Sequence, residues 1–355
     1  MLSRLRVHLV ILSVVSVLGA WAVWGPQRAA GAALWNPYDA VAEIKLPSSV
    51  QYPNLHAVEE YRGYVYVLDY SGVLFTYDTR DLPGRSEFKT YSAPIASLEA
   101  SADHMLLRNG QWLYACGQDG LAVLDLSNPA RPRLHVPGDG EDSYRNMFQS
   151  GDRLAVGGAD TVAIYSLADP SRPVLLGGYS LTSGSVFAVA IHGDLMYWSQ
   201  YTSGVSGGTL HALDISDPSH PSLVWSLMVP DLPYHMRILD GRLLCANNSS
   251  VALWSLANPR QPQVLDSQAA SGRVCALDGG NIVTSGRVFR VNGDVLELVL
   301  RYATGGGQGD GIPHGSAVGS GYVFQAQTQR VLVLKGVAAP EAWPYQLRLP
   351  IVRNR

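Results

Sequence analysis

Apolar and polar positions alternate along this chain in short segments. The segments that begin at Tyr64 and Trp112 are largely apolar, and Gly or a polar residue soon ends each of them. Alternation with a period of two is typical of a half-buried strand, and a short apolar run between turn residues is typical of a fully buried one. The pattern therefore predicts many short β-strands joined by turns rather than a few long helices.

Glycine separates two apolar strands at seven places in the chain. These glycines are Gly63, Gly110, Gly151, Gly193, Gly241, Gly279 and Gly321. Glycine adopts the positive φ that a two-residue hairpin turn requires. Each one therefore predicts a hairpin, and we expect seven units of three strands plus an outer fourth.

A turn that contains proline recurs four times. Its copies begin at Asn128-Pro129, Asp169-Pro170, Asp217-Pro218 and Asn258-Pro259, at spacings of 41, 48 and 41 residues, with a second proline three positions after the first. Each copy follows an apolar strand that ends in a small polar residue able to cap the turn, namely Asp125, Ser166, Asp214 and Ser255. Asx-Pro starts the turn, and proline prevents the strand ladder from continuing.

This spacing matches β-propeller blades, which are about 40 to 50 residues long. Radial packing of successive sheets buries the apolar face that one sheet would expose. We therefore predict an all-β fold, a single β-propeller of about seven four-stranded blades over residues 34–349. Six blades is the alternative, if the weakly patterned unit at residues 273–307 is counted differently. The strand Ala40–Leu46 could close the ring by pairing with Arg330–Lys335, and Tyr345–Leu349 competes for that place.

Two strand-turn strings resemble a known repeat. "LAVLDLSNPARP" from Leu121 and "LHALDISDPSHP" from Leu210 resemble the LVIVD repeat of secreted bacterial and archaeal β-propellers. The resemblance covers about four units, because the first unit has "TYDTRDLPG" in place of the Asx-Pro turn and the last two lack that turn. It implies a propeller fold, an extracytoplasmic location and surface or adhesive contexts. It implies no catalytic residues.

The N-terminus has the composition of an export signal. Arg4 and Arg6 precede the uncharged, largely apolar run Leu9–Gly25, and Ala30-Gly31-Ala32 fits a peptidase site. Residues 1–33 are therefore predicted to be a signal peptide or, because the run is intermediate in length, an uncleaved membrane anchor. Either way we expect the protein to be secreted or at the cell surface. Residues 350–355 are expected to form a C-terminal tail.

The charge balance narrows the classes of partner. The formal net charge is -3 and the pI is about 6.3, so no basic face attracts nucleic acid or anionic lipid. A membrane is expected only through an uncleaved N-terminal segment. We expect a monomer whose partner is a protein or glycan at the cell surface. The odd number of cysteines, Cys116, Cys245 and Cys275, predicts buried core residues, with Cys245 and Cys275 as the one pair to check for a disulfide.

The candidate ligand-binding residues lie where the innermost strand of each unit begins, since propellers usually bind ligands at an end of the channel. One slot there holds His56, His104, Asn146, Phe187, His235, Arg273 and His314. His56, His104, His235 and His314 could bind Zn or Cu, or act as acid and base near neutral pH. The favoured alternative is repeat inheritance, in which each residue ties its strand to a neighbouring loop by a hydrogen bond. The distance from the slot to the next glycine also varies between five and seven residues.

Further polar residues lie beside this slot. Arg145, Arg237 and Arg273, with Asp103, Tyr144, Tyr234 and Asp310, could form a pocket for a carboxylate or sugar, although solvation of surface residues explains them equally well. The predicted ligand-binding set is His56, His104, Asn146, His235, Arg273, His314, Arg145 and Arg237.

Three other sequence features do not change the predicted function. The acidic loop Asp139–Asp142 offers oxygen ligands for Ca²⁺, but it lacks the spacing of a calcium loop and is better explained as a solvated turn. The glycine-rich stretch from Thr304 is predicted to be a flexible connection. The aromatic residues of the second strands are predicted to pack between blades.

The sequence contains no G-x-S-x-G, H-E-x-x-H or C-x-x-C motif. We therefore predict a secreted or surface-associated binding scaffold with its ligand face at one end of the channel. The alternative class is a propeller enzyme, a lyase or hydrolase that uses the ring of histidines with or without a metal.

Overall fold

The computed structural model describes residues 38, 40–47, 55–69, 71–82, 90–94, 105–138, 143–204, 206–302 and 315–336. Only the backbone is described for residues 56, 90–94, 105 and 271–275. The chain divides into two compact units, Met1–Asn36 and Pro37–Arg355, and all described residues belong to the second. The predicted signal segment, the acidic loop at 139–142, the glycine-rich stretch and the C-terminal tail lie outside the described residues.

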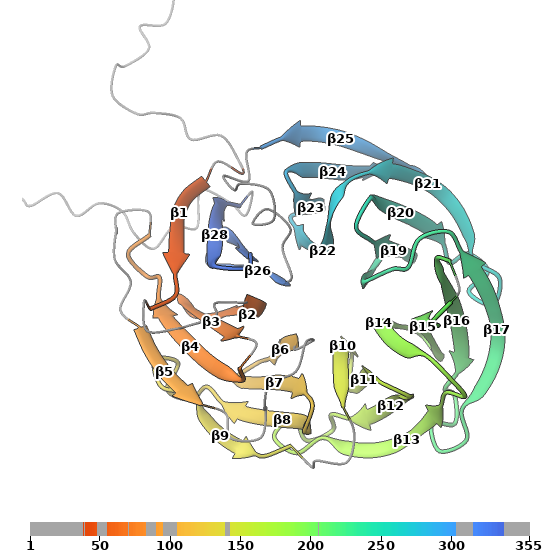
Figure 1. Ribbon diagram of the computed structural model, residues 1–355, viewed down its shortest axis with the longest axis horizontal. Coiled ribbons are helices and arrows are strands. Elements are labelled where there is room, and N and C mark those ends of the chain that lie inside the picture. Colours follow the sequence, from red (N-terminus) through yellow and green to blue (C-terminus); the bar gives the residue numbers. More distant parts are fainter. Residues whose placement is uncertain are drawn as a thin grey trace, which may run out of the picture. The chain divides into compact units, whose positions relative to one another are not determined.

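The second unit is a β-propeller of seven four-stranded antiparallel sheets arranged as a ring (Figure 1). The first strand of each blade lies innermost and the fourth lies at the rim. Seven blades, each with an outer fourth strand, are therefore confirmed, and the six-blade alternative is wrong. The unit at residues 273–307 lacks the Asx-Pro turn, yet its strands form a complete blade because the hairpin ladder does not depend on that turn.

The strands of blades 1 to 3 have the following bounds. Blade 1 contains β2 (Leu55–Tyr61), β3 (Tyr64–Asp69), β4 (Val73–Asp78) and β5 (Thr90–Pro94). Blade 2 contains β6 (Met105–Asn109), β7 (Trp112–Gly117), β8 (Gly120–Asp125) and β9 (Arg133–Val136). Blade 3 contains β10 (Tyr144–Ser150), β11 (Arg153–Gly158), β12 (Thr161–Ser166) and β13 (Val174–Ser180).

The remaining blades follow the same order until the last. Blade 4 contains β14 (Ser185–His192), β15 (Leu195–Tyr201), β16 (Gly208–Asp214) and β17 (Ser222–Val229). Blade 5 contains β18 (His235–Leu239), β19 (Arg242–Ala246), β20 (Ser250–Ser255) and β21 (Gln263–Ala269). Blade 6 contains β22 (Ser271–Asp278), β23 (Asn281–Ser285), β24 (Arg287–Asn292) and β25 (Val295–Arg301). Blade 7 contains β26 (Gly315–Gly319), β27 (Tyr322–Ala326) and β28 (Arg330–Lys335), and its outer strand is β1 (Ala40–Lys45).

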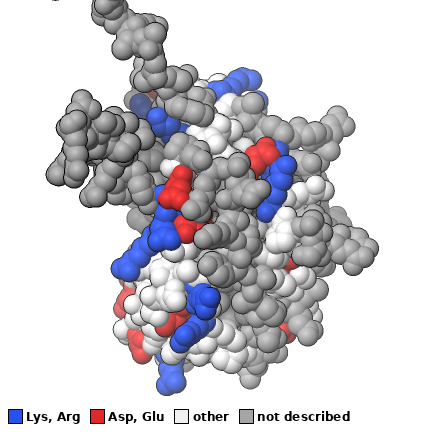
Figure 2. All heavy atoms as spheres, turned by 90° about the vertical axis from the view of Figure 1, so that its left-hand side faces the viewer, with Lys and Arg blue, Asp and Glu red and all other residues white. Residues whose placement is uncertain are grey.

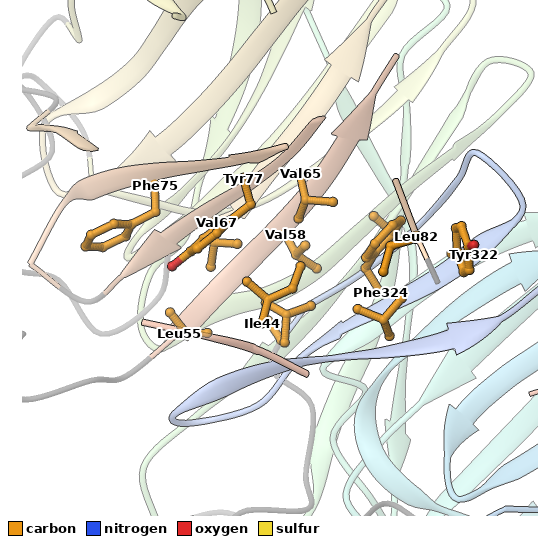
Figure 3. Close-up of a cluster of buried hydrophobic side chains, with 14 residues drawn as sticks. Ile44, Leu55, Val58, Val65, Val67, Phe75, Tyr77, Leu82, Tyr322 and Phe324 are labelled. Atoms are coloured by element: carbon orange, nitrogen blue, oxygen red, sulfur yellow. The ribbon is translucent and has the colours of Figure 1, made fainter. Parts of the chain in front are cut away.

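The ring is closed by the strand from the N-terminal side, as one of the two predicted arrangements proposed. β1 pairs antiparallel with β28, and Ile44 lies opposite Val331. Ile44 is 1% exposed and packs in a cluster that spans blades 7 and 1, together with Val58 and Phe324 (Figure 3). Two segments far apart in the sequence therefore complete one sheet, which removes the open edge that an unclosed ring would leave.

Each seam between neighbouring blades holds its own cluster of buried apolar side chains. Seven such clusters occur among the described residues, one for each pair of adjacent blades, including blades 7 and 1. Burial of apolar surface in these seams is the main favourable contribution to the stability of the ring. Cys116 and Cys245 are buried in two of them, as predicted, while the side chain of Cys275 lies outside the described residues.

The predicted hairpins are confirmed, and they use two kinds of turn. All seven predicted glycines have positive φ. In blade 1 both turn residues, Arg62 and Gly63, have positive φ, at 52° and 77°, which is a type I′ turn. In blade 2 the glycine comes first, with Gly110 at 60°, as in a type II′ turn.

The Asx-Pro turns form as predicted. A backbone N–H three residues on donates to the carbonyl of the Asx residue in each copy, at 2.9, 3.0, 3.0 and 2.9 Å for Asn128, Asp169, Asp217 and Asn258. The small polar residue that ends the preceding strand accepts a hydrogen bond from the backbone N–H two residues later. This holds for Asp125, Ser166, Asp214 and Ser255. The repeated motif therefore satisfies its own backbone groups at the end of the third strand in blades 2 to 5.

A tyrosine in the second strand of one blade ties that blade to the Asx-Pro turn of the next. The hydroxyls of Tyr66, Tyr114 and Tyr197 donate to the carbonyls of Pro129, Pro170 and Pro259 at 2.8, 2.8 and 2.9 Å. All three tyrosines are 0% exposed. Aromatic residues of the second strands thus pack between blades, as the sequence predicts.

Blade 3 has Ala155 at the position of these tyrosines, so its neighbour's turn is held differently. The backbone of Gly177 on β13 lies against the Pro218 carbonyl, and an added Cβ at Gly177 would overlap that oxygen. This contact requires glycine.

Candidate functional site

Equivalent positions of the inner strands are found from the strand register rather than from the distance to the glycine. The fifth residue pair of each hairpin, counted back from the turn, is equivalent from blade to blade. In four blades the inner-strand member of this pair is Ala57, Asn146, Ala188 or His235. The residue immediately before it is His56, Arg145, Phe187 or Tyr234. We call this the entry position, because it lies where the inner strands enter the ring.

The entry position is marked by a β-bulge in three blades. The pairing shifts between Leu55 and Ala57, between Tyr144 and Asn146, and between Val186 and Ala188. His56, Arg145 and Phe187 are therefore the extra residues of their strands. A bulge of this kind turns a side chain out of the regular ladder and is frequent beside binding sites.

Two of the predicted slot residues lie one position deeper than the entry position. Asn146 is 8% exposed, and its Oδ1 accepts a hydrogen bond from the Val189 N–H of the next blade at 3.3 Å. His235 is 3% exposed, and burial, with a further contribution from Arg237, lowers its pKa well below the ordinary 6.5. Asn146 thus ties its strand to the inner strand β14 of the next blade, whereas the repeat-inheritance alternative predicts a hydrogen bond to a neighbouring loop.

The one-residue offset between the predicted slot and the entry position in blades 3 and 5 has a physical reason. Glycine is the second residue of a type I′ turn and the first residue of a type II′ turn, so its distance from the entry position differs by one residue between blades. In blade 3 the entry residue is Arg145 and in blade 5 it is Tyr234, both of which the sequence places beside the slot rather than in it.

Several predicted residues cannot be placed by their side chains. Only the backbone is described for His56 and Arg273, and His104 and His314 lie outside the described residues. Counted from the ends of their inner strands, His104, Arg273 and His314 fall at the entry position in sequence. Within the described part of the chain no three His, Cys, Asp or Glu residues lie close enough to hold a metal ion. Since that part leaves out three of the four predicted histidine ligands, Zn or Cu binding stays a prediction.

Three successive entry residues form a continuous row of side chains, which we call the entry row: Arg145, Phe187 and Tyr234. The Arg145 guanidinium carbon lies 5.5 Å from the centre of the Phe187 ring. The Phe187 and Tyr234 rings meet edge to face, with centroids 5.3 Å apart and planes at 86°. All three side chains are partly exposed. Residues from blade 3, blade 4 and the connection into blade 5 therefore share one surface.

A fourth aromatic ring extends this surface. Tyr201, at the end of β15, is 42% exposed, and its ring centroid lies 6.2 Å from that of Phe187 with an interplanar angle of 82°. Phe187 is thus flanked by two tyrosines at similar angles. Aromatic rings with polar hydroxyls at their ends are suited to ligands that have both apolar and polar parts.

Deeper in the ring, an acidic residue lies in the field of two arginines. Glu59 and Arg237 occupy the same register position, third from the hairpin turn, in blades 1 and 5. Burial raises the pKa of Glu59 to about 7, and the positive charges of Arg108 and Arg237 oppose this rise. The Arg237 Nη1 also donates to the Met236 carbonyl at 3.1 Å. Nothing in the sequence distinguishes Glu59 from the neighbouring Glu60.

The other residues predicted beside the slot are divided between core and undescribed segments. Tyr144 is 1% exposed, and its hydroxyl lies 2.9 Å from that of Tyr165, so it belongs to the core of blade 3. Asp103 and Asp310 lie outside the described residues. Sequence reasoning named Tyr234 only as a flanking residue and Phe187 only as a member of the slot.

Charges of both signs are interspersed on the surface that the figures show. Figure 2 views the side of the ring that carries β1, β4 and β5, and Lys and Arg atoms lie there beside Asp and Glu atoms. Arg80 pairs with Asp78 on this side at 2.7 Å. On this face the charged residues that the structure describes do not form a patch of one sign.

Comparison with known proteins confirms the repeat. The LVIVD repeat matches residues 109–136 and 183–229, which cover most of blade 2 and all four strands of blade 4. The sequence has no significant match among curated proteins. Among the described residues no helix has the length and apolar character needed to cross a membrane.

Solved structures share the fold at low sequence identity. The WD40 β-propeller domain of Doa1 is 12% identical, with a TM-score of 0.62, over 88% of this chain and 100% of that one. The extracellular domain of a hybrid two-component system from B. thetaiotaomicron is 14% identical, with a TM-score of 0.58, over 84% of this chain and 40% of that one. The computationally designed protein Ika8 is 14% identical, with a TM-score of 0.53, over 83% of this chain and 99% of that one. These likenesses define the protein as a β-propeller, and it is one that contains LVIVD repeats.

Proposed function

We propose that this protein is an extracytoplasmic binding scaffold whose ligand site is the entry row. The observation that carries the proposal is the contact of Arg145, Phe187 and Tyr234 across three successive units of the ring. Equivalent positions of a repeat meet at one end of a propeller, so a ligand there contacts several blades at once. A partly exposed row of aromatic and cationic side chains has the composition of a binding surface.

The proposed location outside the cytoplasm rests on two further observations. The N-terminal sequence has the charged, apolar and small-residue regions of an export signal. The propeller of the hybrid two-component system is itself described as an extracellular domain. A partner at the cell surface, either a protein or a glycan, is consistent with this location.

Parallel glycan and peptide arrays test this function. We expect the mature protein to bind a subset of ligands, and Phe187→Ala to lose these ligands because the centre of the entry row is removed. Leu227→Ser is the matched control, since Leu227 is a 42% exposed apolar residue on the outer strand β17. Ligands bound equally by wild type and Phe187→Ala, or lost only in Leu227→Ser, would place the site elsewhere, and no binding on either array would reject the scaffold function.

A further inference from the structure

The outer strand of blade 4, β17, has an open edge on the rim of the ring. β17 is the last strand of its sheet, and Figure 1 shows it on the outside of the ring. Alternate residues of an antiparallel edge strand direct their N–H and C=O groups away from the sheet. The side chains of β17 are open as well, since Leu223, Leu227 and Met228 are 45%, 42% and 68% exposed. A further strand can therefore pair alongside β17.

β17 lacks the features that protect the other outer strands from such pairing. Edge strands are commonly protected by charge, by proline or glycine, or by being short. Each of the other six outer strands has such a feature: Glu43 and Lys45 in β1, Pro94 in β5, Arg133 in the four-residue β9, Gly177 and Gly178 in β13, Asp266 in β21, and Glu297 and Arg301 in β25. The eight residues of β17, Ser222–Val229, include no charged residue, proline or glycine.

A β-bulge, which is another protective feature, interrupts only the first part of β17. The pairing with β16 shifts between Leu223 and Trp225, so Val224 is the extra residue. Beyond this bulge the five residues Trp225–Val229 pair with β16 in unbroken register. This length is close to that of an ordinary strand in a sheet. A second strand can therefore pair in regular register along Trp225–Val229.

A second copy of the same strand suits this edge. Two identical strands that pair antiparallel are related by a two-fold axis, so side chains near the axis lie close to their own copies. A charge on the strand would then meet the same charge on its partner, and β17 has none. Recognition of a different protein would draw specificity from complementary charges, which β17 does not supply.

We propose that this protein forms a two-fold dimer in which Trp225–Val229 of each copy pair antiparallel along the outer edges of β17. The two blade 4 sheets then become one continuous sheet. The dimer takes the place of the monomer expected from the sequence. The interface contains none of the entry-row residues, so this inference is independent of the proposed function.

Sedimentation equilibrium of the mature protein tests the proposal. The interface buries one strand from each copy, which is less than a standard interface, so we expect a weak dimer with a Kd of about 1 to 100 μM. Met228→Lys should weaken dimerisation about tenfold, because the dimer loses two methionine contacts and gains two like charges. Met228 is 68% exposed, so this change should leave the fold intact.

Leu175→Lys is the matched control. Leu175 is a 57% exposed apolar residue near the start of β13, the outer strand of blade 3, so the same charge is added outside the interface. This variant should dimerise as wild type does. Leu227→Ser, the control on the arrays, keeps β17 uncharged and its main-chain groups in place, so it should also form the dimer. Circular dichroism and thermal unfolding confirm that each variant is folded.

Three results would overturn the dimer. The first is a wild-type protein that stays monomeric at about 300 μM, which is above the expected range of Kd. The second is a dimer that Met228→Lys leaves unchanged, since the copies would then meet elsewhere. The third is a dimer that Leu175→Lys weakens as much as Met228→Lys does. Ligand binding on the arrays is measured separately, so failure of this inference is distinguishable from failure of the proposed function.

Discussion

Replacing Ile44 with Asp should destabilise the propeller by about 3 to 5 kcal/mol, because it places a charge inside an apolar seam. Ile44 is 1% exposed and packs in the cluster that joins blades 7 and 1. The same strand completes blade 7 through its pairing with β28. Loss of β1 would therefore leave an open sheet edge and an open ring.

The measurement is urea unfolding followed by circular dichroism, with Lys45→Asp as the control. Lys45 is the next residue on the same strand and is exposed, so its replacement should cost less than about 0.5 kcal/mol. An Ile44→Asp protein as stable as the Lys45→Asp protein would mean that the ring does not depend on β1.

A second contact at the seam supports this expectation. Just before β1, the Tyr38 N–H donates to the Lys335 carbonyl at 2.7 Å, and its hydroxyl donates to Asp278 Oδ2 at 3.2 Å. Asn281 Nδ2 donates to the same hydroxyl at 3.1 Å. The N-terminal segment is thus attached to both blade 7 and blade 6, which explains why a strand without a repeat of its own occupies the closing position.

Wild-type protein should lose stability between about pH 4.5 and pH 7, and Glu59→Gln should lose much less. Burial raises the pKa of Glu59 from its ordinary 4.5 to about 7, so the folded state holds this proton more tightly than the unfolded state. Between these two values the free energy of unfolding falls as pH rises, because the unfolded state releases this proton while the folded state still holds it. The shift corresponds to about 1 to 3 kcal/mol after screening by solvent.

Urea unfolding at several pH values measures this effect as the difference between wild type and variant. The comparison with the variant is needed because His211, whose pKa burial lowers to about 4, gives a slope of the opposite sign below pH 6.5. Glu297→Gln, an exposed residue on β25, is the control and should follow the wild-type profile. A Glu59→Gln profile parallel to that of wild type would contradict the assignment.

Features set by neighbouring residues could be predicted from the sequence. The hairpins follow from glycine at positions such as Gly63, and the Asx-Pro turns follow from side chains that cap their own backbone, as Asp125 does. The closing strand could be predicted because Ala40–Lys45 has strand character outside the repeat. Each of these depends on a local conformational preference.

Features that depend on register or on distant parts of the chain could not be predicted in the same way. The bulges beside Arg145 and Phe187 add a residue to one strand only, and the two turn types displace the glycine by one position. The tie between Tyr114 and Pro170 joins residues of different blades, so no local pattern signals it. The raised pKa of Glu59 likewise arises from burial within the ring, and its sequence neighbours resemble those of an exposed strand.

The most direct test of the central claim is a crystal structure of the mature protein with the tightest-binding ligand from the arrays. The account predicts that this ligand contacts Phe187, between Tyr201 and Tyr234. A ligand bound at the hairpin end of the ring or along the outer strands, with the entry row empty, would contradict it.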